Sequence, residues 1–498
     1  MEERIILGKI VYREREEYFS LTKEDRRKHF YVIGKTGTGK TTLLLNMLIQ
    51  DIRNGEGVGF FDPHGDALLK LLKYIPQERI EDVVFLNPAD LDHPFAFNPL
   101  EDVDYYKRTL VTSMILSVFK KIWQDAWSAR MEYILQNSIL TLLEYPGSTL
   151  LDINRLLADD SFRKRVVSQL KDPVVKAFWE NEFDKYHLQF RTEAIAPIQN
   201  KVGQFIANPL LRNIIGQRKS TVDLSEILNE GKIFLVNLAI GQIGEISAQL
   251  LGGLLINALY LKAMERVNIP EEERRDFYLY IDEFQNFATE SFVNILSEAR
   301  KYRFNLILAH QFLDQLDESL KKAILGNVGS MMVFRVGTID AQIFFEEFER
   351  LVSLESFLNL PSYYAYVKIL YQNKPQRPFL AQTLPLETEP EVSYLDEILS
   401  YNHLKYSAPR EIVEARIRRI YLSSKKEDFL ICRLCGIQFP NDEDIEICPN
   451  CRQRAFVKGI SLKELAKKNF SVKIKKEEKN KKVDLDSILK KLEGNESQ

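Results

Sequence analysis

Two patterns of apolar residues alternate along this chain of 498 residues. Short apolar runs, which are typical of buried strands, stand at 30–33, 58–61, 83–86, 232–238, 277–281, 305–308 and 330–334. Several segments between them carry the 3.6-residue period of helices, notably 246–264 and 291–302. Short apolar strands that alternate with helices predict a mainly parallel sheet covered on both faces, and therefore an α/β fold.

From about residue 104 to 230 the helical period dominates and strand-like runs are absent from the sequence pattern. We therefore expect an all-α domain inserted into the sheet domain. Closing strands at 364–370 and 379–383 extend the sheet domain to about residue 385. The expected organisation is a β-rich lead-in (1–28), the sheet domain (29–103 and 231–385), the inserted all-α domain (104–230), a linker with an amphipathic helix (386–428), a small cysteine module (429–457) and a Lys-rich flexible tail (458–498).

Composition narrows the class of protein only a little. Sixty-eight Lys and Arg against 71 Asp and Glu give a net charge of −3, which argues neither for nor against nucleic acid, because a basic channel can be hidden in a balanced total. The pattern shows no N-terminal apolar segment and no apolar stretch expected to span a bilayer. We expect a cytoplasmic location. The alternative is a peripheral position at the inner face of a membrane.

The first strand leads into a complete G-x-x-x-x-G-K-[ST] phosphate-binding loop. Its glycines allow backbone N–H groups to turn toward phosphates, and the following helix adds its N-terminal partial charge. Lys40 is expected to reach the β- and γ-phosphates, and the Thr41 hydroxyl to hold Mg²⁺. The expected nucleotide-binding residues of this segment are Gly34, Lys35, Thr36, Gly37, Thr38, Gly39, Lys40, Thr41 and Thr42.

A second element of the same chemistry follows the strand at 277–281, which ends in two carboxylates. This is a Walker B pattern, in which Asp282 is expected to bind nucleotide through Mg²⁺ and Glu283 to polarise the attacking water. The alternative is an ordinary acidic turn after a strand. An Asn-Lys-x-Asp guanine element is absent from the sequence, so ATP is the expected nucleotide.

The next strand ends in a histidine and a glutamine. Gln311 is expected to contact the γ-phosphate and the water, whereas His310 is expected to be a packing or hydrogen-bonded histidine. Phosphoryl transfer also needs positive charge beyond Lys40, and a cation from a neighbouring subunit can supply it. The sequence offers three arginines for this role: Arg300, Arg303 and Arg335.

Two C-x-x-C pairs, Cys432/Cys435 and Cys448/Cys451, are separated by twelve residues. Four thiolates at this spacing predict a closed, structural Zn²⁺ site in a zinc ribbon. The alternatives are a redox dithiol pair or disulfides. The zinc ribbon is expected to bind either nucleic acid or protein. The Lys-rich tail slightly favours nucleic acid.

The combination of 33–41, 62–66 (Asp-Pro-His-Gly-Asp), 98–100 (Asn-Pro-Leu), 280–284 and 299–311 resembles the HerA/FtsK superfamily. Within it the chain is most similar to the type IV secretion coupling proteins, hexameric ATPases that pump DNA in conjugation. The resemblance covers roughly residues 5–385. It departs from the family in two ways: N-terminal transmembrane helices are absent from the pattern, and a four-cysteine module follows.

The resemblance implies a RecA-like P-loop domain that forms a homohexameric ring with nucleotide at the subunit interfaces. It also implies that Arg300, eleven positions before Gln311, is the cation supplied in trans. The expected function is an ATP-driven DNA translocase, with relaxosome or secretion-channel proteins as further partners. Two rivals stay open: an ATPase for secretion or assembly that does not bind DNA, and a HerA-like helicase or translocase in DNA repair.

The sequence does not single out the residues that contact DNA. Basic side chains in and after the helical region, interleaved with Phe190 and Phe205, are the ones available, and core packing explains such aromatics more often than base stacking does. These basic residues are Arg191, Lys201, Arg212, Arg218 and Lys219.

Overall fold

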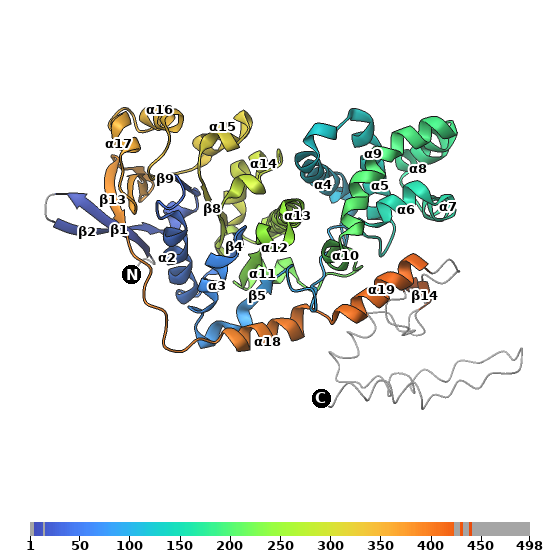
Figure 1. Ribbon diagram of the computed structural model, residues 1–498, viewed down its shortest axis with the longest axis horizontal. Helices are drawn as coiled ribbons and strands as arrows, with labels where there is room; N and C mark the ends of the chain where they lie inside the picture. The colour runs from blue at the N-terminus through green and yellow to red at the C-terminus, as the bar shows by residue number, and fades with distance from the viewer. Residues whose placement is uncertain (1–3, 13–14, 423–428, 432–437, 441–498) are drawn as a thin grey trace, which may run out of the picture. The chain divides into compact units, whose positions relative to one another are not determined.

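The computed structural model describes residues 4–12, 15–422, 429–431 and 438–440 (Figure 1). The chain divides into two compact units, Met1–Ser424 and Lys425–Gln498. In the second unit, β14 (Phe429–Ile431) pairs antiparallel with β15 (Gln438–Pro440). The four cysteines of the predicted zinc site, Cys432, Cys435, Cys448 and Cys451, lie outside the described residues, as does the predicted tail.

Among the described residues of the first unit, eleven strands form one sheet in the order β2-β1-β13-β10-β9-β3-β8-β7-β4-β6-β5. The parallel strands are β9 (Ser330–Val333), β3 (Phe30–Ile33), β8 (Phe304–His310), β7 (Phe277–Ile281), β4 (Gly57–Asp62), β6 (Ile233–Asn237) and β5 (Val83–Leu86). The antiparallel strands are β10 (Tyr364–Lys368), β13 (Phe379–Thr383), β1 (Arg4–Tyr12) and β2 (Arg15–Thr22). The mainly parallel α/β sheet is confirmed, and β1 and β2 both lie within the expected β-rich lead-in (1–28).

Helices cover both faces of the sheet, as continuous apolar strands require. Phe60 belongs to the core that contains α2 (Lys40–Arg53) and α3 (Asp66–Leu72). Its neighbour Phe61 points to the other face and contacts Phe287, with ring centroids 6.4 Å apart. Phe287 in turn lies against Gly252 of α13 (Glu245–Met264), where a Cβ would collide with the phenyl ring.

The segment between β5 and β6 is helical, as predicted. Its α-helices are α4 (Arg108–Ile122), α5 (Ala129–Glu144), α6 (Asp152–Ala158), α7 (Asp160–Ser168), α8 (Pro173–Ala177), α9 (Leu188–Ala207), α10 (Pro209–Ile215) and α11 (Leu224–Asn229). Helix α4 packs against α13, which joins this region to the sheet (Figure 1). Its division into a separate domain, with the boundaries given above, stays a prediction.

The segment after residue 385 differs from the expected linker, because it contains a second helix. Helix α18 (Leu395–Tyr406) packs against β5 and buries Ile398 in the sheet core. Helix α19 (Arg410–Leu422), which was predicted, packs against α10 (Figure 1). The shorter elements are α1 (Lys23–Arg26), α12 (Ile240–Ile243), α14 (Phe292–Glu298), α15 (Glu318–Asn327), α16 (Thr338–Glu347), α17 (Leu354–Leu358), β11 (Leu370–Tyr371) and β12 (Lys374–Pro375).

One helical stretch corrects an expectation about apolar segments. Glu245–Asn268, which includes α13, is long and apolar enough to cross a membrane by length and composition. In the structure, however, 72% of its most apolar window is buried, against α4 and other elements of the first unit. Its apolar surface is therefore accounted for by packing within the protein.

Candidate nucleotide site

Four neighbouring parallel strands bring the predicted site residues to one edge of the sheet. In the sheet order β3-β8-β7-β4, the P-loop follows β3, Gln311 follows β8, Asp282 and Glu283 follow β7, and Asp62 ends β4. Carboxyl ends of parallel strands meet at the same edge, where ligands of open α/β sheets bind. The strand order thus gathers residues that are up to 277 positions apart, from Gly34 to Gln311.

The P-loop has the conformation that its glycines permit. Gly37 (φ 75°) and Gly39 (φ 112°) occupy the left-handed region, which other residues rarely adopt. Lys40 begins α2, and its buried Nζ donates to the carbonyl of Gly34 at 2.6 Å. Burial lowers the pKa of Lys40, while Glu283 and Asp282 act in the opposite direction.

The predicted Mg²⁺ ligands are in direct contact. The Thr41 hydroxyl donates to Oδ2 of Asp282 at 2.9 Å. Asp282 is 3% exposed, and its burial, with the neighbouring charge of Glu283, raises its pKa to about 6 against the opposing effect of Thr41. A hydroxyl and a carboxylate side by side, next to a phosphate loop, are a donor set that fits Mg²⁺ bound to nucleotide.

Glu283 and Gln311 form a second pair beside the first. The Gln311 amide donates to Oε1 of Glu283 at 2.9 Å, and the Gln285 amide donates to Oε2 at 2.8 Å. Glu283 has a left-handed backbone (φ 45°), and its N–H donates to Oδ1 of Asp282 at 2.9 Å. Such strain in a residue other than glycine is typical of functional sites, where surrounding contacts maintain it.

His310 lies behind this pair rather than in it. The ring is buried, hydrogen-bonded through Nε2 to the hydroxyl of Tyr31, and packed edge-on against Phe284. Burial lowers the pKa of His310 to about 3, so the ring is neutral at ordinary pH. The structure thus places His310 as a hydrogen-bonded packing residue.

The three candidate arginines have different surroundings. Arg303 contacts Asp276 and Glu271, with nitrogen–oxygen distances of 3.8 and 3.7 Å, and Arg335 donates to the carbonyl of Leu360 at 3.4 Å. Arg300 is exposed in the turn Ala299–Tyr302 before β8, and within the described residues no hydrogen bond or ion pair engages its guanidinium. Because β8 separates it from Gln311 by about 20 Å, Arg300 lies at the opposite edge of the sheet from its own P-loop.

Sequence reasoning missed two residues that shape the site. Tyr363, before β10, donates its N–H to the carbonyl of Thr38 at 2.7 Å, and its ring lies against Gly39. Gln285 holds the second oxygen of Glu283. A signal for Gln285 was its place two residues after the carboxylate, whereas no local pattern links Tyr363 to the loop.

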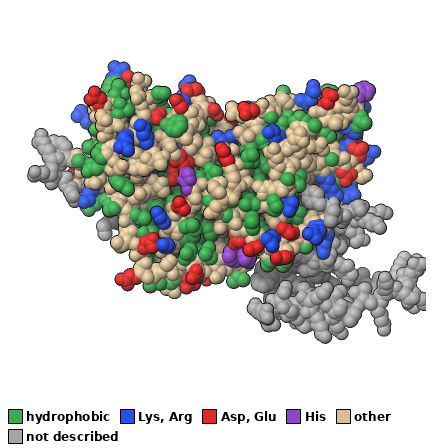
Figure 2. All heavy atoms as spheres, viewed as in Figure 1, with side chains coloured by type: hydrophobic (Ala, Val, Ile, Leu, Met, Phe, Trp, Pro, Cys, Tyr) green, Lys and Arg blue, Asp and Glu red, His purple; other side chains and the backbone are tan. Residues whose placement is uncertain are grey.

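The basic residues of the helical region stay without assignment as DNA contacts. Phe205 is buried and stacks on Trp123, with ring centroids 5.2 Å apart, so it is a core residue. Phe190 is 36% exposed and lies beneath the guanidinium of Arg130. On the face drawn in Figure 2, acidic and basic side chains are intermingled.

The chain is similar in sequence to a type 4 coupling protein and to a DNA import protein. The chain is 22% identical over 362 residues to the type 4 coupling protein DotL of Legionella pneumophila, covering 60% of this chain and 46% of DotL. It is 22% identical over 308 residues to the DNA import protein CedB of Sulfolobus acidocaldarius, covering 60% of this chain and 43% of CedB. The chain thus spans less than half the length of these curated relatives.

Among solved structures, the plasmid coupling protein TrwB in complex with ADP and Mg²⁺ shares the fold. The TM-score is 0.54 at 16% identity, and the match covers 79% of this chain and 97% of the TrwB chain. The family model described as the type IV secretion-system coupling protein DNA-binding domain matches residues 18–348, which is more than half of the chain. The chain therefore belongs to the type IV coupling protein family.

Proposed function

We propose that this protein is an ATP-driven DNA translocase of the type IV coupling protein kind. The observation that carries the proposal is the pair of contacts at one sheet edge, Thr41 with Asp282 and Glu283 with Gln311, directly beside the P-loop. Family membership supports it, as do the nucleotide complex of TrwB and the description of CedB as a DNA import protein.

The chain's own residues account for the chemistry. A bound Mg²⁺–ATP would supply the phosphoanhydride bond and a metal that neutralises its charge. Lys40 would exchange the Gly34 carbonyl for the phosphates, and the N-terminus of α2 would face them. Thr41 and Asp282 would hold the metal. Glu283 would accept the proton of the attacking water, while Gln311 fixes the orientation of that carboxylate.

We infer that the working form is a homohexameric ring. The support is the position of Arg300, which is exposed and too far from its own P-loop to reach nucleotide there. Supplied to a neighbouring subunit, this guanidinium would complete that subunit's site. Arg303 is a weaker candidate, since its side chain lies near Asp276 and Glu271 of its own chain.

The cysteine module and the location belong to the same proposal. Cys432, Cys435, Cys448 and Cys451 would bind one structural Zn²⁺, on the support of their spacing alone. The motor would act in the cytoplasm, with a peripheral position at the inner face of a membrane where a secretion channel or relaxosome is its partner.

The test is ATP turnover by the full chain with and without DNA. We expect turnover to rise when DNA is added, and to be strongly reduced with or without DNA in Glu283→Gln. If DNA does not change the rate of ATP turnover at protein concentrations where rings form, the result would favour the secretion or assembly ATPase. DNA-stimulated turnover together with co-purification of a nuclease, rather than of secretion components, would favour the repair translocase.

A further inference from the structure

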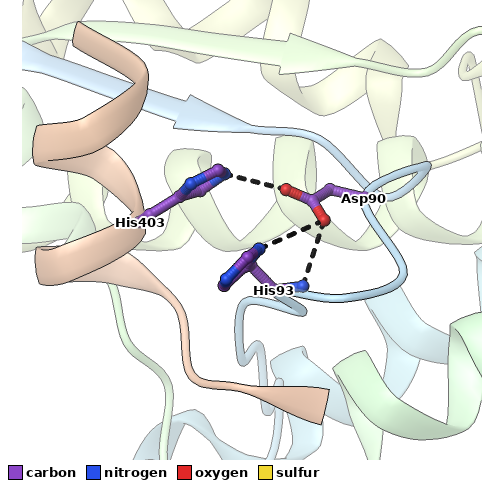
Figure 3. A group of neighbouring side chains, drawn as sticks. All are labelled: Asp90, His93 and His403. Atoms are coloured by element: carbon purple, nitrogen blue, oxygen red, sulfur yellow. Dashed lines mark hydrogen bonds and ion pairs between the residues drawn. The ribbon is translucent and has the colours of Figure 1, made fainter. Parts of the chain in front are cut away.

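Two histidines and an aspartate converge beside β5, the last strand in the order of the sheet (Figure 3). Asp90 and His93 lie in the loop after β5, and His403 lies on α18. Nε2 of His403 is 2.8 Å from Oδ2 of Asp90, and Nδ1 of His93 is 3.6 Å from Oδ1. The imidazole rings are stacked, with centroids 4.3 Å apart and planes 17° apart, so both rings face the same carboxylate.

The two segments that supply these side chains are fixed to each other on both sides of the cluster. On one side, the side-chain oxygen of Asn402 accepts from the N–H of Phe85 at 2.6 Å. On the other, the N–H of Arg410 donates to the carbonyl of Asp92 at 2.9 Å, and Phe95 forms a β-bridge with Ser407. The loop after β5 and the end of α18 therefore hold their three donors in place without help from an ion.

The donor set and its spacing suit a transition-metal cation. One ligand atom from each of the three side chains lies within 4.8 Å of the other two. Tetrahedral Zn²⁺ with bonds of about 2.0–2.1 Å separates its ligands by about 3.3–3.4 Å. Nε2 of His403 is 2.8 Å from Oδ2 of Asp90, as a hydrogen-bond partner, and Nδ1 of His93 is 3.6 Å from Oδ1, so the carboxylate lies near both rings through different oxygens. Two imidazoles and one carboxylate favour Zn²⁺ over Mg²⁺ or Ca²⁺, which prefer oxygen ligands alone.

The surroundings leave room for a fourth ligand. The three side chains line a cavity of about 290 Å³, bounded also by Phe95, Leu399 and Tyr406. His93 and His403 are 41% and 42% exposed at the side chain, so an ion and its water can enter from solvent. The polar neighbour Asn402 is already engaged, with Phe85 and with the carbonyl of Ile398. Asn87, Tyr406 and Ser407 also bring polar side chains to the cavity, and the Ser407 hydroxyl donates to the carbonyl of His403.

We propose that Asp90, His93 and His403 bind a divalent transition-metal ion, Zn²⁺ in the first place, with water as the fourth ligand. The ion would add a further link between α18 and the loop after β5, which already hydrogen-bond to each other. In sheet order β5 is five strands from β3, or about 24 Å at the usual strand spacing. The site is therefore separate from the nucleotide site, and the proposal does not depend on ATP chemistry.

Bound metal in the full chain tests this inference. Reduced protein is brought to equilibrium by dialysis against micromolar free Zn²⁺, and zinc per chain is counted for the wild type, His403→Ala and Asp90→Asn. The matched control is His187→Ala, because His187 is exposed and outside the cluster. We expect both cluster variants to bind one equivalent less than the wild type, and His187→Ala to equal the wild type.

Co²⁺ in place of Zn²⁺ separates this site from the cysteine module. Only thiolate ligands give a sulfur-to-metal charge-transfer band, so that band should keep its intensity in His403→Ala while one equivalent of Co²⁺ is lost. Asp90→Asn retains an acceptor for His403 and should keep the thermal stability of the metal-free wild type. Equal metal content in the wild type and both cluster variants would overturn the proposal. An equal loss in His187→Ala would also overturn it, because it would show nonspecific binding to histidine.

Discussion

Asp282 and Glu283 are neighbours in sequence but have different partners. Asp282 is held by the hydroxyl of Thr41, on the side of the P-loop, whereas Glu283 is held by the amides of Gln311 and Gln285. Glu283 also has a left-handed backbone conformation, with φ 45°. The adjacent carboxylates therefore have separate partners, as the proposed roles of Asp282 toward a metal and Glu283 toward water require.

Glu283→Gln should bind ATP and fail to hydrolyse it. The amide preserves the size of the side chain and leaves Asp282 and Thr41 in place, but it is not a base, so we expect turnover to fall by about 10²- to 10⁴-fold. Lys40→Ala should instead weaken nucleotide binding, because the phosphates lose their nearest cation. Binding of a fluorescent ATP analogue and phosphate release distinguish the two. The control is Glu290→Gln, at an exposed carboxylate that pairs with Lys120. Near-normal turnover in Glu283→Gln would show that Glu283 is not the general base.

His29 should make stability fall in mild acid. Its Nδ1 accepts from the N–H of Leu306 at 3.1 Å, so Nε2 carries the proton and donates to the carbonyl of Leu296 at 3.2 Å. Burial lowers the pKa of His29 to about 4 from 6.5. Between these values the unfolded chain binds the proton and the folded chain does not, so up to about 3 kcal/mol is lost as the pH falls from 6.5 to 4.

The measurement is urea unfolding of the wild type and His29→Gln at several pH values. His29→Gln should be the less stable at pH 7.5, and the gap should narrow toward pH 4.5. His187→Gln, at an exposed ring, should follow the wild type throughout. A gap that stays constant with pH would mean that His29 is not held neutral by the fold.

At the scale of residues, the sequence predicted the side chains that directly follow strands. Lys40, Asp282, Glu283 and Gln311 could be placed together because parallel strands end at a common edge. The contact of Tyr363 with the P-loop could not be predicted. Tyr363 precedes β10, which pairs antiparallel with β9, and only the three-dimensional structure shows that this pairing brings Tyr363 to the loop. The cluster of Asp90, His93 and His403 was missed because α18 was not foreseen.

At the scale of elements, a buried network joins the P-loop helix to the Walker B strand. Arg26 of α1 donates to both oxygens of Asp51 on α2, at 2.7 and 2.6 Å, and to the hydroxyl of Tyr280 on β7 at 2.9 Å. Tyr280 also donates to Asp51. Because Thr41 lies in the first turn of the same helix and Asp282 follows the same strand, this network helps to set the spacing of Thr41 and Asp282, the proposed metal ligands.

Asp51→Ala should destabilise the fold severely. It leaves the guanidinium of Arg26, 3% exposed, buried without its anion, which costs about 3–5 kcal/mol. The matched control on the same helix is Arg53→Ala, which breaks an exposed ion pair with Glu387 and should cost at most about 1 kcal/mol. Urea unfolding measures both, and equal costs for the two variants would mean that the Arg26 network does not hold α2.

Most of the sheet strands followed the hydrophobic pattern. Strands β3, β5 and β7 begin and end where the apolar runs do, because burial on both faces leaves no polar position inside them. Strand β2 was expected only as part of a β-rich lead-in, and helix α18 was missed. Each buries only part of its surface, including Leu21 in β2 and Ile398 in α18. Each also lies in a charged segment, whose composition predicts exposure to solvent.

At the scale of the whole molecule, Arg300 should act on ATP bound to a neighbouring subunit. Arg300→Ala should bind ATP normally and hydrolyse it slowly, by a loss on the order of 10³ if the cation is fully engaged. In rings that mix Arg300→Ala with Lys40→Ala, some interfaces pair an intact Lys40 site with an intact Arg300. Turnover should therefore partly return in the mixture. A mixture no more active than either variant, with mixed rings shown to form, would transfer the role to Arg303 or Arg335.

ATP hydrolysis at the edge of this sheet should drive movement of the protein along DNA. The most direct test is ATP turnover per chain, measured with single- and double-stranded DNA of increasing length at a fixed concentration of DNA ends. A motor that moves along DNA spends longer on a longer track before it reaches an end, so turnover should rise with length and then level off. A turnover rate that is the same for every DNA length, or the same without DNA, would show that ATP hydrolysis is not coupled to movement along DNA.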